Sequence, residues 1–371
     1  MSQQQATATT TNEKPQNVPA FKSNMQKILK KLVLDPEAFT AEDAASATKE
    51  IMEGRATHAQ IGSYLTALKL TKLDRNPAIV ASSALEMRDH GLPISFAEYP
   101  ELQDQLVDIV GTGGDGHDTF NVSTTAAIVA AGAGVKVAKH GNRASSSACG
   151  SADILEKIGC RIDNVRPEQV VPLLHKHNFC FLFAQTYHPA MKQTSQPRRE
   201  LGIPSIFNIM GPLSNPAKPR RVVVGVHSRQ LGALMIESLK LMGLISGMVV
   251  CGANGLDEIS PEGETHVWKL IKGEIIEETI SPAQFGLPSH PLTSVKGGGP
   301  QENAQILEDL LNNKFQSPGH PILDFVLLNA AALLVVDGKA DNFEAAVEIA
   351  RDSVVSGKAR AVLEGFRKDI Q

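Results

Sequence analysis

The spacing of hydrophobic residues changes along the chain and divides it into two parts. Between residues 21 and 95 apolar residues recur at the spacing of one helix face, as at Met25, Ile28, Leu29 and Leu32. Helix-start signals occur in the same part. The TAED segment at Thr40 has the form of a capping box, and Thr57 and Asn76 precede two further apolar runs. This pattern predicts an all-helical segment without catalytic residues of its own.

From Leu106 onward, short apolar runs alternate with helical patterns. The predicted strands cover residues 106–110, 135–139, 179–184, 221–226 and 247–251. Because helices separate these strands, they should pair in parallel. Residues 267–280 differ, since two β-rich runs meet at Lys272-Gly273, which predicts an antiparallel hairpin at a sheet edge.

Helical patterns return at the end of the chain, over residues 322–336, 342–356 and 358–367. The first of them is the longest apolar stretch, but it contains Asp324 and Asn329 and is too short to cross a bilayer. It is therefore expected to be a buried helix. No membrane association is predicted.

A glycine-rich segment follows the first predicted strand. Residues 111–116 read GTGGDG, and the hydroxyl-rich TFNVST of residues 119–124 leads into a helical pattern. Glycines allow sharp bends and bring backbone N–H groups close to a ligand, and a helix N-terminus favours an anion. The order strand, turn, helix predicts a seat for phosphate or pyrophosphate. The alternative is a tight turn without a ligand. The segment is neither a P-loop nor a dinucleotide fingerprint.

A second polar cluster follows the next strand. Residues 139–143 read KHGNR and residues 144–156 continue ASSSACGSADILE. Because neighbouring strand ends in an α/β sheet share one crevice, both clusters should face the same ligand. A cation, an imidazole, an amide and several hydroxyls suit a multiply anionic small molecule. The alternative is a solvent-exposed basic loop.

Composition narrows the possible functions. The chain has 371 residues, of which 42% are hydrophobic, enough for two or three domains with sizeable cores. A net charge of −4 argues against nucleic-acid binding. Four cysteines without metal-ligand spacing predict reduced thiols in a cytoplasmic protein. The Gln- and Thr-rich residues 1–20 lack an apolar core and predict a disordered tail rather than a secretory signal.

Taken together, the motifs resemble those of the anthranilate phosphoribosyltransferases. The resemblance runs from about residue 25 to the C-terminus, and it rests on the two clusters, FLFAQTYHPAMK (181–192), RRELGIPSIFNIMGPLSNP (198–216) and Asp257-Glu258. It implies an α/β fold class: a small all-helical N-terminal domain, residues 21–98, joined by about 166–205, and a larger domain, residues 99–165 and 206–371, with a mainly parallel sheet flanked by helices. It also implies a homodimer.

The resemblance further implies transfer of ribose 5-phosphate from phosphoribosyl pyrophosphate to the amino group of anthranilate, in tryptophan biosynthesis. Pyrophosphate leaves with the help of Mg²⁺, as two ions, one of them bound with the donor. No general base is assigned, because the arylamine is already neutral at pH 7. The donor-binding residues implied are Gly111, Thr112, Gly113, Gly114, Asp115, Thr119, Asn121, Ser123, Thr124, Lys139, Ser147 and Gly150. The metal ligands implied are Ser123, Asp257 and Glu258.

Anthranilate carries a carboxylate, which the planar fork of an arginine binds best. Within the RRELG motif the matching arginine is Arg198. The residues implied to bind anthranilate are Gly111, His140, Asn142, Tyr187, His188 and Arg198. For His140 and His188 the alternative is that each anchors its loop. Asp118 would repel a phosphate and should point outward. Pro204 stands where many family members carry a basic residue.

Two other functions compete with this one. A pyrimidine nucleoside phosphorylase of the same fold would release a base from a nucleoside, but Asn142 and the segment RRELG…GPLSNP weigh against it. A non-catalytic binding protein would have lost a metal-binding or phosphate-binding residue, and none is missing.

The Ser145–Gly150 segment is expected to fold over the donor.

Overall fold

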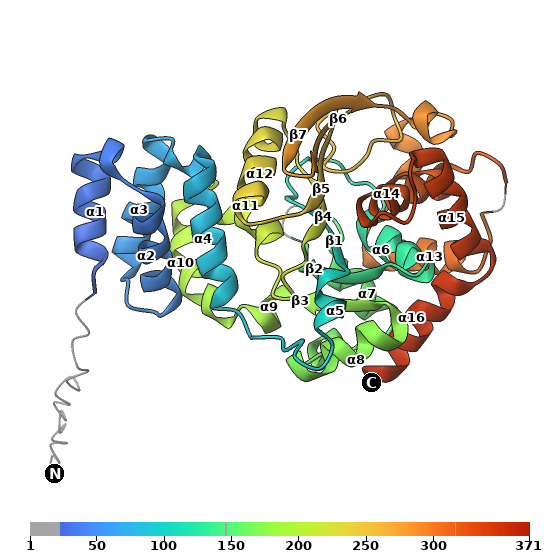
Figure 1. Cartoon of the computed structure of the whole chain (residues 1–371), viewed down its shortest axis with the longest axis horizontal. Helices are drawn as coiled ribbons and strands as arrows, with labels where there is room; N and C mark the ends of the chain where they lie inside the picture. Colours follow the sequence, from blue (N-terminus) through green and yellow to red (C-terminus); the bar gives the residue numbers. More distant parts are fainter. Residues whose placement is uncertain (1–22, 145–146, 316) are drawn as a thin grey trace, which may run out of the picture.

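The computed structural model describes residues 23–144, 147–315 and 317–371, and it places a helical domain beside a larger α/β domain (Figure 1). The predicted tail over residues 1–20 lies outside the described residues. The helices of the smaller domain are α1 (Met25–Leu34), α2 (Ala41–Met52), α3 (His58–Leu70), α4 (Pro77–Asp89) and α10 (Lys192–Leu201).

The predicted helix starts in this domain are confirmed. Thr40 and Asp43 form a reciprocal capping box at α2, and Thr57 forms another with Gln60 at α3. The Asn76 side chain accepts the first free N–H groups of α4. Local sequence therefore determines where these helices begin, while their apolar faces pack together into one core.

The larger domain is built on one seven-stranded sheet in the order β3-β2-β1-β4-β5-β6-β7. Its first five strands pair in parallel and the last two form the predicted edge hairpin, in which Lys272 and Gly273 both have positive φ. The strands are β1 (Leu106–Gly111), β2 (Lys136–Gly141), β3 (Phe179–Phe183), β4 (Arg221–Gly225), β5 (Ser246–Gly252), β6 (Thr265–Ile271) and β7 (Glu274–Ile280).

Helices cover both faces of the sheet. On one face lie α6 (Val122–Gly132), α14 (Pro321–Asp337), α15 (Phe343–Val355) and α16 (Lys358–Asp369), and on the other lies α12 (Arg229–Leu241), which also packs on α4. Alternation along β4 sends Val223 to the first core and Val222 and Val224 to the second. The second core continues into the helical domain. The remaining helices are α5 (Pro100–Asp104), α7 (Ser151–Lys157), α8 (Pro167–His177), α9 (Ala184–Tyr187), α11 (Phe207–Met210) and α13 (Pro300–Leu311).

The structure corrects the expected path of residues 166–205. Helix α8 packs against β2, β3 and α16, and β3 is an edge strand of the sheet, so residues 167–183 belong to the α/β domain. The end of the segment returns to the helical domain: Ala190 and Met191 pack on its core, and α10 packs against α2 and α3. Residues 206–213 also share the core of the helical domain. The apolar face of α8 would suit a place on either domain, so the sequence pattern did not determine its position and tertiary packing did.

The C-terminal apolar stretch is a buried helix, as predicted, and all four cysteines are free and buried. Within the described ranges no helix has the length and apolar character needed to span a membrane.

One buried amide connects α14 to the loop after β5. The Asn329 side chain accepts the Ile259 N–H at 3.0 Å and donates to the Ile259 carbonyl at 3.2 Å. Both residues are fully buried, so no water competes for these groups. This pair fixes the chain next to Asp257-Glu258.

We expect Asn329→Leu to lower the free energy of unfolding by about 2–4 kcal/mol, because the Ile259 N–H and C=O would be buried without partners. Urea denaturation followed by circular dichroism measures this loss. The matched control, Asn312→Leu at the exposed end of α13, should change stability by less than about 1 kcal/mol. Equal effects of the two substitutions would contradict the assigned role of Asn329.

Candidate active site

The sheet positions a pocket of about 300 Å³ at its topological switch point. From β1 the chain proceeds to β2 and β3 on one side and then to β4 and β5 on the other. The loops that follow β1 and β4 therefore diverge and leave a crevice at the carboxyl ends of the strands. The pocket lies there, lined by residues that follow β1, β2 and β5.

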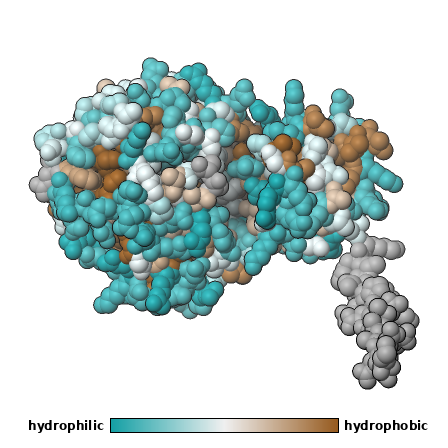
Figure 2. Space-filling view, turned by 180° about the vertical axis from the view of Figure 1, so that it is seen from behind, coloured by the Kyte–Doolittle hydropathy of each residue, from teal (hydrophilic) through white to brown (hydrophobic). Residues whose placement is uncertain are grey.

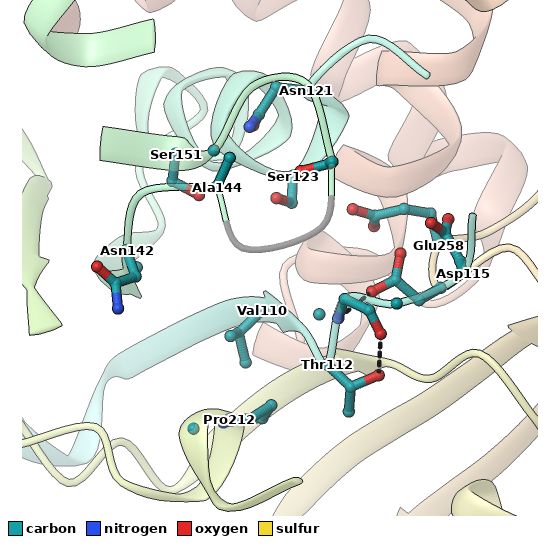
Figure 3. Close-up of a pocket in the computed structure, with 18 of the residues that line it drawn as sticks. Val110, Thr112, Asp115, Asn121, Ser123, Asn142, Ala144, Ser151, Pro212 and Glu258 are labelled. Carbon is teal, nitrogen blue, oxygen red and sulfur yellow. Dashed lines mark hydrogen bonds between the residues drawn. The ribbon is translucent and has the colours of Figure 1, made fainter. Parts of the chain in front are cut away.

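The glycine-rich loop after β1 forms one wall of the pocket. Gly113, Gly114 and Gly116 all have positive φ, which side chains rarely tolerate. The N–H of Gly113 donates to Asp257 Oδ2 at 2.7 Å, and Thr112 Oγ1 contacts the Gly113 carbonyl (Figure 3). Thus a carboxylate of the protein already contacts the loop where an anionic ligand was predicted.

The start of α6 forms the facing wall. Asn121 is the N-cap, its side chain accepting the Thr124 N–H, and its own N–H donates to Asn303. Figure 3 shows Asn121 and Ser123 across the pocket from Thr112. Ser123 Oγ lies 3.4 Å from Lys139 Nζ, which also donates to the Ile109 carbonyl at 2.7 Å. A helix N-terminus, hydroxyls and a buried lysine thus face the glycine loop.

Three carboxylates gather at one end of the pocket: Asp115, Asp257 and Glu258. Burial, and then the charge of Asp115, raises the pKa of Asp257 to about 7. Burial, reinforced by Asp257, also raises the pKa of Glu258 well above its usual value, and Lys139 opposes this shift. Because these carboxylates lie close together and are shielded from water, their negative charge must be neutralised by a bound cation or a proton.

The opposite end of the pocket has no carboxylate among its described lining residues and lies toward Asn142 (Figure 3). Arg143 also lines the pocket, but its guanidinium is paired with Glu156. This end is lined by His140 and Asn142 from β2 and its loop, and by Asn208 and Pro212 from the segment around α11. His140 is buried, and burial lowers its pKa well below the usual value. Its ring meets that of His188 edge to face, with centroids 5.2 Å apart. These neutral groups suit an aromatic ligand.

Most residues predicted for the site line this pocket, on several different elements. They are Gly111, Thr112, Gly113, Gly114, Asp115, Thr119, Asn121, Ser123, Lys139, His140, Asn142, Ser147, Gly150, Asp257 and Glu258. Asp118 is exposed and does not line it, as expected. The loop expected to cover the donor is described only from residue 147, and the Asp153 carboxylate accepts N–H groups from Ala144 and Gly150 on either side of the gap.

Four predicted residues do not line the pocket. Thr124 is buried inside α6, and the Tyr187 hydroxyl donates to the Val165 carbonyl in the core. Tyr187 therefore supports the fold rather than a ligand, which corrects the prediction. His188 lies behind His140. Arg198 stacks over the Phe207 ring at 5.7 Å, next to the pocket residue Asn208.

Asn208 and Pro212 were not assigned a role from sequence. They belong to the IFNIMGPLSNP motif, which carried the resemblance without indicating which side chains face the pocket. The only sequence signal for a role of these two residues was that they belong to this motif. Their positions depend on how α11 packs against α4.

The fold and the site together define a two-domain glycosyl transferase. A family model described as "Glycosyl transferase family, a/b domain" matches residues 103–360, and one described as "Glycosyl transferase family, helical bundle domain" matches residues 26–91. The second match covers α1–α4, and the first spans most of the α/β domain together with α10, the helix that returns to the helical domain.

Individual relatives narrow the class. An anthranilate phosphoribosyltransferase from Schizosaccharomyces pombe is 45% identical over 329 residues, covering 89% of this chain and 92% of the relative. The solved enzyme of that name from Saccharomyces cerevisiae, in complex with PRPP and Mg, superposes with a TM-score of 0.86 at 33% identity, covering 95% and 99% of the two chains. The Thermus thermophilus structure gives 0.83 at 39%, covering 92% and 99%. The chain belongs to the anthranilate phosphoribosyltransferase family.

The raised pKa of Asp257 predicts a pH effect on the metal-free protein. The pKa of an Asp side chain in an unfolded chain is about 4, whereas folding raises the pKa of Asp257 to about 7. Between these values the folded state binds more protons, so this residue makes the free energy of unfolding fall as pH rises. Asp257→Asn should flatten that slope and make the protein more stable than wild type above pH ~7.

Urea denaturation in EDTA, across the same pH range, checks this expectation. Asp118→Asn, at an exposed position outside the pocket, is the matched control and should leave the slope unchanged. A slope that Asp257→Asn does not alter would show that Asp257 ionises normally in the folded protein.

Proposed function

We propose that this pocket transfers the 5-phosphoribosyl group from phosphoribosyl pyrophosphate to the amino group of anthranilate. The products are N-(5-phosphoribosyl)anthranilate and pyrophosphate, in tryptophan biosynthesis. The observation that carries the proposal is the division of the pocket, with all its lining carboxylates and a phosphate-type loop at one end and a histidine and two asparagines at the other. A charged donor and an aromatic acceptor require this division.

The donor is proposed to bind between the glycine loop and the start of α6. Backbone N–H groups, the hydroxyls of Thr119 and Ser123, the Asn121 amide and Lys139 provide donors and positive charge for phosphates. Ser147 and Gly150 would approach from the second loop. Thr124 is buried and its N–H donates to the Asn121 side chain, so it is proposed to act on the donor only indirectly, by fixing Asn121 at the start of α6.

Magnesium fits the carboxylate end of the pocket. The negative charge of Asp115, Asp257 and Glu258 exceeds what Lys139 neutralises, and hard oxygen ligands suit Mg²⁺. In the described part of the chain no cluster of three His, Cys, Asp or Glu side chains has metal-ligand geometry, so donor oxygens and water would complete the coordination. We propose two ions held by Ser123, Asp257 and Glu258. Bound there, they would neutralise the departing pyrophosphate.

The acceptor is proposed to bind at the other end, against Gly111, His140 and Asn142. Its carboxylate would reach Arg198, whose guanidinium is half-buried and desolvated, which lowers its pKa. His188 would support His140 from behind. The bond from C1 of ribose to pyrophosphate breaks as the bond to nitrogen forms, and the nitrogen then loses its extra proton to water. Alignment and charge stabilisation, rather than a base, would supply most of the rate.

Anthranilate fluorescence provides the test. A decay that requires purified protein, phosphoribosyl pyrophosphate and Mg²⁺ together is the expected result. Asp257→Asn with Glu258→Gln should weaken the dependence of the rate on Mg²⁺. Phosphate-dependent cleavage of thymidine or uridine, without any fluorescence decay, would instead assign the fold to nucleoside phosphorolysis.

Arg198→Ala is expected to raise the anthranilate KM about tenfold or more, because a charge-assisted hydrogen bond to the carboxylate is lost. The donor KM should change little. Initial rates at varied concentrations of each substrate measure both constants. Arg199→Ala is the matched control, since Arg199 is exposed on the same helix turn. A larger effect at Arg199, or on the donor, would remove Arg198 from the acceptor site.

We propose a homodimer formed through the helical domain, and a cytoplasmic location consistent with four unpaired cysteines. Large apolar side chains are exposed on the neighbouring helices α1 and α3, including Leu34 and Leu70, which are about 80% exposed. Figure 2 shows hydrophobic residues gathered at this end of the molecule. Exposed apolar groups on two adjacent helices favour a second copy as the covering partner.

Leu34→Glu with Leu70→Glu should convert the dimer to a monomer, because the charges would be buried without partners. Sedimentation velocity measures the change. Val355→Glu, at an exposed apolar position of α15, should leave the dimer intact. A wild-type protein that sediments as a monomer would refute the proposed dimer.

A further inference from the structure

His227 lies behind the glycine-rich loop, on the side away from the ligand pocket. It follows β4 and immediately precedes Ser228, the N-cap of α12. Its Nδ1 atom lies 3.0 Å from the Gly113 carbonyl oxygen and 3.4 Å from Thr112 Oγ1. His227 itself does not line the pocket, whereas Gly113 and Gly114 do. The imidazole therefore contacts the loop from outside.

The contact determines which imidazole nitrogen carries the proton. A carbonyl oxygen only accepts hydrogen bonds, so Nδ1 must donate to Gly113. In the neutral ring the hydrogen then sits on Nδ1 and Nε2 is left as an acceptor. This tautomer follows from the 3.0 Å distance to the Gly113 oxygen.

The same contact orients the peptide between Gly113 and Gly114. In a planar trans peptide the C=O and the following N–H point in opposite directions. Because the Gly113 carbonyl points at His227, the Gly114 N–H points away from it. Within the described residues this N–H has no hydrogen-bond partner. It is therefore free to bind a phosphate oxygen.

Glycine makes this orientation vulnerable. Gly113 and Gly114 have φ of 68° and 83°, and without side chains their connecting peptide can rotate at little steric cost. Asp257 holds the Gly113 N–H at 2.7 Å but does not touch the next peptide. Thr112 Oγ1 lies 3.3 Å from the Gly113 carbonyl, a longer contact than that of His227. The imidazole is thus the strongest restraint on this peptide.

We propose that His227 is a positioning residue for the donor: through Nδ1–H it holds the Gly113–Gly114 peptide so that the Gly114 N–H faces the pyrophosphate. This inference rests on the proposed function of the pocket, and it assigns a role to a residue outside the pocket. The position is rigid because β4 and α12 hold the backbone on either side of His227, and the Val226 N–H donates to the Val250 carbonyl at 2.9 Å.

Two substitutions separate this role from a merely structural one. His227→Asn places an amide N–H near the position of Nδ1, whereas His227→Gln places it near the position of Nε2. Isothermal titration calorimetry with phosphoribosyl pyrophosphate and Mg²⁺, without anthranilate, should give near wild-type affinity for His227→Asn. His227→Gln should bind about tenfold more weakly, the loss of one hydrogen bond to a charged ligand. The anthranilate KM should be the same in both variants.

A nitrogen-15 NMR spectrum of the imidazole, assigned by its loss in His227→Asn, should show the Nδ1–H tautomer. An Nε2–H tautomer, equal donor affinity in His227→Gln and wild type, or a matching rise in the anthranilate KM would each overturn the proposal. The calorimetry needs only the donor, so it tests the role of His227 separately from the reaction. A protein that bound the donor without consuming anthranilate would refute the proposed reaction, and the comparison of His227→Asn with His227→Gln would still decide the role of His227.

Discussion

The close contact between Asp257 and the glycine-rich loop is the constraint on which the site depends. A Cβ at Gly111 would lie 2.5 Å from Asp257 Oδ2, and one at Gly225 would collide with the Asp257 backbone. The ends of β1 and β4 and the segment after β5 therefore meet only because both strands end in glycine. This approach brings the Asp257 carboxylate to the Gly113 N–H, and it places Glu258 within the influence of Lys139.

That arrangement concentrates charge at a cost in stability. Burial raises the pKa values of Asp257 and Glu258, and it raises the pKa of Asp108, inside β1, to about 6. Buried carboxylates are retained where a ligand compensates them, and such groups commonly mark functional sites. Rigid neighbours hold them in place, including the Asn329 amide on Ile259. The protein thus uses a strong hydrophobic core to support an electrostatically unfavourable pocket.

The acceptor end depends on a different kind of contact. Asn208 and Pro212 reach the pocket from a segment that shares the core of the helical domain, while His140 and Asn142 come from the sheet. The pocket therefore spans the junction between the two domains. Any movement of one domain relative to the other would change the acceptor end more than the donor end, whose walls both belong to the α/β domain.

Sequence alone determined the local features. These are short-range signals: the capping boxes at Thr40 and Thr57, the strand pattern and the glycine motif. They can be recognised in the sequence because they depend on backbone sterics and on the periodicity of neighbouring residues. Ordered motifs also identified the family and most of the pocket. Tertiary structure decided that α8 covers the sheet, that the Tyr187 hydroxyl turns into the core, and that Asn208 faces the pocket. An apolar face or a polar side chain does not encode its partner, because that partner comes from a distant part of the chain.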